Sequence, residues 1–150
     1  MVTNSDSHLE SLFPGLASSD YEITSLFDPK YNCVAWAASD QKRWWEPDPM
    51  GVSYWPASAP RDYTLAAYQQ AFESLGYAQC DGESREHGFA KVALFAKANK
   101  PTHASRQLGS SLWTSKLGKN VDITHELHAL SGGPYGDVTK ILRRAKRATP

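Results

Sequence analysis

The chain has few cysteines, no long apolar run and no net charge. Two cysteines in 150 residues are too few for a disulfide framework or a zinc site of four thiolates. No apolar stretch approaches the roughly 20 residues that span a bilayer, and the N-terminus lacks the features of a secretory signal. Sixteen basic residues balance sixteen acidic ones, so no overall field draws the chain to nucleic acid or a membrane. We therefore expect a cytoplasmic protein that binds neither.

The chain does contain enough apolar and aromatic material for one packed domain. Aromatic residues make up 11% of it, and five of them are tryptophan. Residues 1–20 are rich in Ser and Asp, so we expect a loosely ordered arm that Leu12, Phe13 and Leu16 pin to the body. Residues 21–150 would then form a single domain.

Local patterns predict helices first and an antiparallel sheet after them. In residues 63–76, apolar side chains recur at i, i+3, i+7 and i+10, which is typical of an amphipathic helix. In residues 89–97, side chains alternate between two faces, which is typical of a strand. Further elements are expected as a helix at 32–41, strands at 101–108 and 112–118, a short helix around His125 and His128, and a final basic helix over KILRRAKR, residues 140–147. This order indicates an α+β fold.

Residues 46–61, EPDPMGVSYWPASAPR, form a segment that we name the Trp-rich loop. It carries four prolines, which exclude a helix or a central strand. Trp44, Trp45, Tyr54 and Trp55 lie in or beside it. Long ordered loops in compact domains are often functional. The aromatic side chains would either anchor the loop on the core or line a substrate cleft.

Cys33 is the candidate for chemistry. A thiol at the start of a helix has a lowered pKa, because free backbone N–H groups stabilise the thiolate. A nucleophilic thiol also needs an imidazole, and His103 is placed to supply one from a strand. The next strand offers Thr114, Ser115 and Lys116 to orient that imidazole.

These residues resemble a known superfamily. YNCVAWA followed by THASRQLGSSLWTSKLG is similar to the Cys–His core of papain-like hydrolases, in the transglutaminase-like and NlpC/P60-like branches. The resemblance implies a Cys-bearing helix packed on a short antiparallel sheet. It makes Cys33 the nucleophile and His103 its base. The YNC-AWA, PTHA-RQL and WTSKLG blocks also resemble an uncharacterised bacterial family.

A second alignment is open. In it, Lys91 stands where the NlpC/P60-like branch has its catalytic histidine, and His103 takes the orienting position. We prefer the first alignment because it keeps an imidazole beside the thiol. It predicts a hydrolase or acyl transferase that acts on a peptide or protein amide, with Ser115 orienting His103. The residues expected as substrate-binding or oxyanion groups are Asn32, Trp36, Trp55, Lys116 and His125.

No metal or organic cofactor is expected for such chemistry. His125 and His128 lack a third ligand and the spacing of a metalloprotease. The rival hypothesis is a non-catalytic module of the same fold that contacts a protein partner through the Trp-rich loop. The basic C-terminal segment would either be a solvated helix end or dock on an acidic partner or nucleic acid.

Overall fold

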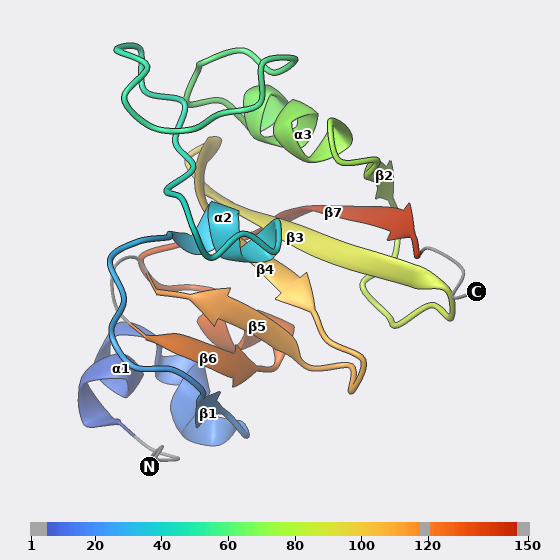
Figure 1. Cartoon of the computed structure of the whole chain (residues 1–150). Coiled ribbons are helices and arrows are strands. Elements are labelled where there is room, and N and C mark those ends of the chain that lie inside the picture. Colours follow the sequence, from blue (N-terminus) through green and yellow to red (C-terminus); the bar gives the residue numbers. More distant parts are fainter. Residues whose placement is uncertain (1–5, 118–120, 147–150) are drawn as a thin grey trace.

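A seven-stranded antiparallel sheet organises the chain (Figure 1). The computed structural model describes residues 6–117 and 121–146. The strand order is β1-β6-β5-β4-β3-β7-β2, and every neighbouring pair is antiparallel. The strands are β1 Glu22–Ile23, β2 Ala78–Cys80, β3 Phe89–Lys97, β4 Lys100–Gln107, β5 Trp113–Lys116, β6 Asp122–His125 and β7 Asp137–Ala145. Both edge strands are short, which limits pairing with other chains.

The described part of the chain forms three short helices. They are α1 Ser7–Leu12, α2 Cys33–Ala37 and α3 Leu65–Glu73. Two 3₁₀ turns, η1 Pro14–Ser18 and η2 Leu127–Leu130, complete the elements. The helix predicted at 63–76 is confirmed as α3, whose N-cap is Thr64. Within the described ranges, no helix has the length and apolar character that crossing a bilayer requires.

Each face of the sheet covers its own apolar core. On the first face, α2, α3 and the Trp-rich loop pack on Val92, Leu94 and Ala104. On the second face, α1, η1 and η2 pack on Ala93 and Phe95. Neighbouring residues of one strand thus enter different cores, because side chains alternate across a sheet. The N-terminal segment contributes Leu9, Phe13 and Leu16 to the second core, whereas Leu12 is 41% exposed.

The papain-like α+β expectation is wrong. The sheet dominates the described residues, and the five-residue α2 is much shorter than the predicted 32–41 helix. The expected C-terminal helix is instead strand β7, which lies between β3 and β2. The short helix expected around His125 and His128 is confirmed only for His128, which lies in η2, whereas His125 ends strand β6.

The basic residues of β7 explain why a strand replaces the predicted helix. Arg143 lies over the Phe89 ring and pairs with Glu86. Arg144 lies over the Tyr77 ring and donates to the Leu75 carbonyl. These tertiary contacts pair the positive charges of β7 with distant groups in the extended conformation. They outweigh the local helix propensity of the segment.

Candidate functional site

Asn32 fixes the start of α2. Its side-chain oxygen accepts hydrogen bonds from the backbone N–H of Ala35 (3.2 Å) and of Trp45 (3.1 Å). Its amide nitrogen donates to the Trp45 carbonyl at 2.7 Å. Asn32 is therefore the N-cap of α2. The same side chain also ties the segment after α2 back to the helix start, so its amide is engaged with the backbone.

Cys33 is the first residue of α2 and is half-buried. Burial raises the pKa of its thiol to about 11, and this effect outweighs the lowering by backbone N–H groups of Ala104, Val34 and Cys33 itself. The thiol is therefore protonated at neutral pH. The position of Cys33 at the start of a helix therefore does not lower the thiol pKa enough to give a thiolate.

His103 belongs to a buried hydrogen-bonded network that spans three strands. Its Nε2 lies 2.9 Å from Oγ of Ser115, and the same oxygen lies 2.7 Å from Nε2 of His125. Ser105 adds a contact of 2.6 Å to the Ser115 hydroxyl. All four side chains are buried. The structure thus brings together the predicted pair His103 and Ser115, and it adds His125.

The proton positions in this network follow from one carbonyl. The Glu126 carbonyl lies 2.7 Å from Nδ1 of His125 and can only accept, so Nδ1 carries the proton. Burial lowers the pKa of His125 to about 4, so its ring is neutral and Nε2 accepts from Ser115. Ser115 then accepts from Nε2–H of His103. This leaves a lone pair on Nδ1 of His103, a buried atom that has no hydrogen-bond partner among the residues that the structure describes.

The structure separates Cys33 from His103 across strand β4. His103 pairs with Phe95, and its ring packs on Phe95 and Tyr135 of the second core. Cys33 packs against the first core, to which Ala104 belongs. No hydrogen bond joins the two residues, both of which lie within the described ranges. Burial, and then the nearby His125, lower the pKa of His103 well below its usual value, so the two groups form no thiolate–imidazolium pair.

The remaining predicted site residues have other partners. Nε1 of Trp36 donates to Thr114 at 2.9 Å, and Nε1 of Trp55 donates to the Pro60 carbonyl at 2.9 Å. Lys116 is fully buried, donates to the Asp28 carbonyl and lies over the Tyr31 ring. Lys116 and Trp36 thus lie on the α2 face of the sheet, away from the His103 network.

The two histidines considered as metal ligands lie in different surroundings. His125 is part of the buried network, whereas the exposed His128 pairs with Glu83 at 2.8 Å. In the part of the chain that the structure describes, no three His, Cys, Asp or Glu side chains are grouped as metal ligands.

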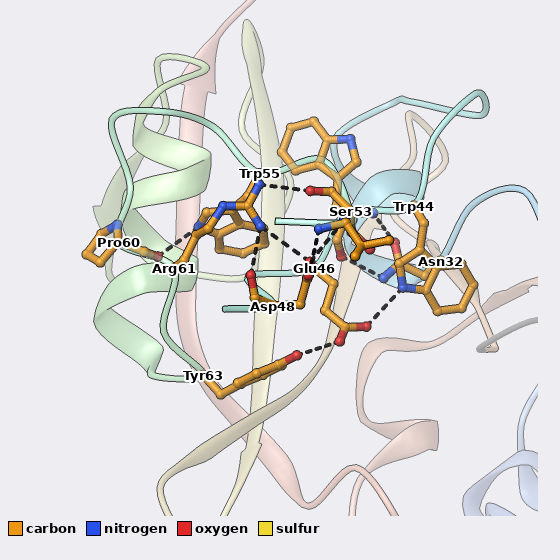
Figure 2. Close-up of polar contacts among 11 residues, drawn as sticks. Asn32, Trp44, Glu46, Asp48, Ser53, Trp55, Pro60, Arg61 and Tyr63 are labelled. Carbon is orange, nitrogen blue, oxygen red and sulfur yellow. Dashed lines mark hydrogen bonds and ion pairs between the residues drawn. The ribbon is translucent and has the colours of Figure 1, made fainter. Parts of the chain in front are cut away.

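The Trp-rich loop is held by a dense set of polar contacts (Figure 2). The Asp48 carboxylate accepts from the backbone N–H of Val52 (2.7 Å) and Ser53 (3.0 Å). Arg61 donates to the carbonyls of Asp48 (3.0 Å) and Ser53 (2.8 Å). The two ends of the turn at residues 48–53 are therefore clamped by one carboxylate and one guanidinium.

A second group of contacts anchors this loop to the body. The Glu46 carboxylate accepts from Nε1 of Trp44 at 3.0 Å and from the Tyr63 hydroxyl. Trp55 is buried and packs on Tyr68 of α3, with ring centres 5.1 Å apart. Trp45 and Trp55 are buried and thus anchor the loop on the body, as one of the two expectations holds.

A family model now places the chain among known sequences. The model, described as a domain of unknown function (DUF7689), matches residues 22–143. The chain belongs to this family. No curated protein and no solved structure matches it. The matched range of the DUF7689 domain includes Cys33, the His103 network and the whole Trp-rich loop.

The sequence patterns did not identify two residues of the DUF7689 domain, Tyr135 and Arg43. Tyr135 stacks on His103 with ring centres 4.0 Å apart, although the GGPYG segment around it predicts only a break in the chain. Arg43 lies over the Tyr54 ring at 3.7 Å and bonds Asp40 through Nε at 3.0 Å. The run KRWW at 42–45, two cations beside two aromatics, was the signal for the second.

Proposed function

We propose that this domain is a protein-binding module whose contact surface is the Trp-rich loop. One observation carries the proposal. Met50 and Val52 are each 86% exposed, yet they belong to the turn that Asp48 and Arg61 clamp. Exposed apolar side chains on a fixed backbone suit binding, because little conformational entropy is lost when a partner covers them.

The partner of this proposal is another protein. Burying large apolar side chains supplies the main favourable free energy of protein association. Tyr54 and Tyr63, which are 36% and 48% exposed, extend the apolar surface and add hydroxyl groups that suit the rim of an interface. A cytoplasmic location, as the sequence predicts, is part of the proposal, and the two free cysteines are consistent with it.

Site-specific photocrosslinking tests the module. A photoreactive benzoylphenylalanine replaces Met50 in the full chain, expressed in the cell that naturally produces it. We expect an adduct with a different protein, and we expect it to disappear when Val52→Asp is added. The matched control places the same photoreactive residue at Lys100, an exposed position at the start of β4. Equal adducts at both positions, adducts only with a second copy of the chain, or none would overturn the proposal.

The amide hydrolase is a second candidate, and the lone pair on Nδ1 of His103 favours it. That atom is the base that such chemistry needs. The sulfur of Cys33 accepts a hydrogen bond from the backbone N–H of Ala104, the residue after His103 in β4. A negative charge on Cys33 would also raise the pKa of Tyr135, the residue that stacks on His103. Activity would require the thiol and the imidazole to meet across β4. Alkylation of Cys33 against pH tests this candidate, because a thiolate–imidazolium pair would give an inflection below pH 8.5 that moves upward in His103→Ala.

A further inference from the structure

A hollow beside the Trp-rich loop combines three cations with aromatic walls. It has a volume of about 480 Å³, and we name it the basic hollow. Its lining includes Lys30, Lys42, Arg43, Trp44, Val52 and Tyr54, and no carboxylate is among the lining residues. Val52 and Tyr54 also belong to the proposed contact surface. The hollow and the loop are therefore parts of one continuous surface.

Arg43 is held in place at the wall of the basic hollow. Its guanidinium lies 3.7 Å from the Tyr54 ring centre, and its Nε bonds Asp40. Among the described residues, its two terminal nitrogens have no hydrogen-bond partner. A guanidinium fixed in this way presents N–H groups for a carboxylate at little further cost in side-chain entropy.

Asp40 anchors Arg43 without filling the hollow. Its oxygens accept from the backbone N–H of Lys42 (2.8 Å) and Arg43 (3.2 Å) and from Nε1 of Trp45 (2.9 Å). Burial alone would raise the pKa of Asp40, but these hydrogen bonds and the Arg43 charge lower it. The carboxylate is thus ionised and saturated with donors from its own segment.

The two lysines leave positive charge available. Lys42 is exposed, and its side-chain ammonium has no hydrogen-bond or ion-pair partner within residues 6–117 and 121–146. Lys30 is 70% exposed and approaches Asp28 only to 3.7 Å. Exposed pairs of this kind are weak and exchange readily for a better-placed carboxylate.

We infer that the basic hollow binds an acidic segment of the protein partner, with a carboxylate on Arg43 and an apolar side chain against Trp44 and Val52. The inference rests on the proposed function, since it assigns the chemistry of the partner. A carboxylate fits better than a polyanion, because Asp28 and Asp40 already pair with Lys30 and Arg43 and the chain as a whole is neutral. Polyphosphate partners are bound instead by extended basic fields.

The test is a titration of the full chain with defined peptides, followed through the indole N–H signal of Trp44 by NMR. The probes are an acetylated and amidated Glu-Glu-Phe-Glu-Glu peptide and its counterpart with Gln in place of every Glu. We expect the acidic peptide to shift the Trp44 signal and the Gln peptide to bind at least tenfold more weakly. The double variant Lys30→Glu/Lys42→Glu should lower affinity for the acidic peptide at least tenfold.

The matched control reverses two lysines elsewhere, in Lys97→Glu/Lys100→Glu, where the two residues pair at the adjoining ends of β3 and β4. It should retain the affinity of the unmodified chain. Equal binding of the two peptides, no binding of either, or an equal loss in the control would overturn the inference. Tighter binding of a phosphoserine peptide or of oligothymidylate would also overturn it.

The photocrosslink at position 50 distinguishes this failure from failure of the proposed function. If Lys30→Glu/Lys42→Glu leaves the adduct unchanged, the binding module stands and the acidic partner segment is rejected. If the acidic peptide binds but no adduct forms at position 50, the hollow is confirmed as an acidic-peptide site and the loop is rejected as the contact surface.

Discussion

Ser115 Oγ lies 2.9 Å from Nε2 of His103 and 2.7 Å from Nε2 of His125, so one hydroxyl joins two buried imidazoles. Ser115→Ala would leave the His103 N–H, the His125 lone pair and the Ser105 hydroxyl without this partner. Unsatisfied buried groups cost about 1–3 kcal/mol. We expect the free energy of unfolding in urea at pH 7 to fall by that amount. Ser58→Ala, at an exposed serine, is the control and should change little.

Acid should destabilise the fold through the same network. Burial lowers the pKa of His125 to about 4 in the folded chain, below its ordinary value of 6.5. Between these two values the unfolded chain binds more protons, so the free energy of unfolding falls as pH falls from 6.5 towards 4. The full effect of His125 is about 3 kcal/mol.

Urea unfolding between pH 7 and pH 5 measures this slope. It should become shallower in His125→Gln, because the depressed imidazole is gone. His128→Gln, at the exposed histidine that pairs with Glu83, is the matched control and should keep the slope. A slope that is the same in His125→Gln and in the unmodified chain would contradict the assignment.

Cys33 should be a slow thiol. Its pKa of about 11 lies two units above the ordinary 9.0, which means about a hundredfold less thiolate at neutral pH. We expect iodoacetamide alkylation, measured against pH with Cys80→Ala as background, to show no inflection below pH 8.5. His103→Ala should not change the profile. An inflection below 8.5 that moves upward in His103→Ala would instead favour the hydrolase.

The guanidinium of Arg61 should control the rigidity of the Trp-rich loop. Arg61→Ala removes the donors to the Asp48 and Ser53 carbonyls. Loss of roughly 1.4 kcal/mol of local stability corresponds to about tenfold faster exchange of the Val52 and Ser53 amide hydrogens. Amides within α3 should exchange as before. Arg85→Ala, at an exposed arginine, is the control; unchanged Val52 and Ser53 exchange in Arg61→Ala would show that Asp48 alone fixes the turn.

Local periodicity explains which elements the sequence predicts. Strand β3 runs over Phe89–Lys97, as the alternation in FAKVALFAK predicts, and the strands expected at 101–108 and 112–118 are present as β4 and β5 with a longer connection of five residues, 108–112. The residues that form each of these patterns lie close together in the sequence. Strand β7 was not predictable in this way, because the groups that match its Arg143 and Arg144 lie about 57 to 69 residues away in the chain.

The candidate site was predictable only in part, because its geometry depends on which face of the sheet each strand residue occupies. Ser115 and His103 lie on adjacent strands, so their contact follows once both strands are placed. The separation of Cys33 from His103 depends on which face each strand residue occupies. A shift of one residue in register exchanges the two faces, and the sequence does not show that register. His103 therefore lies on the far side of β4, whereas its neighbour Ala104 faces α2.

The position of β7 has a consequence for the order in which the chain assembles. During synthesis, β2 and β3 emerge long before the strand that lies between them. Until Asp137–Ala145 is made, β2 has no partner and one side of β3 remains open. The nascent chain therefore carries an incomplete sheet until β7 emerges, and the insertion of β7 between β2 and β3 should be the slow step of folding.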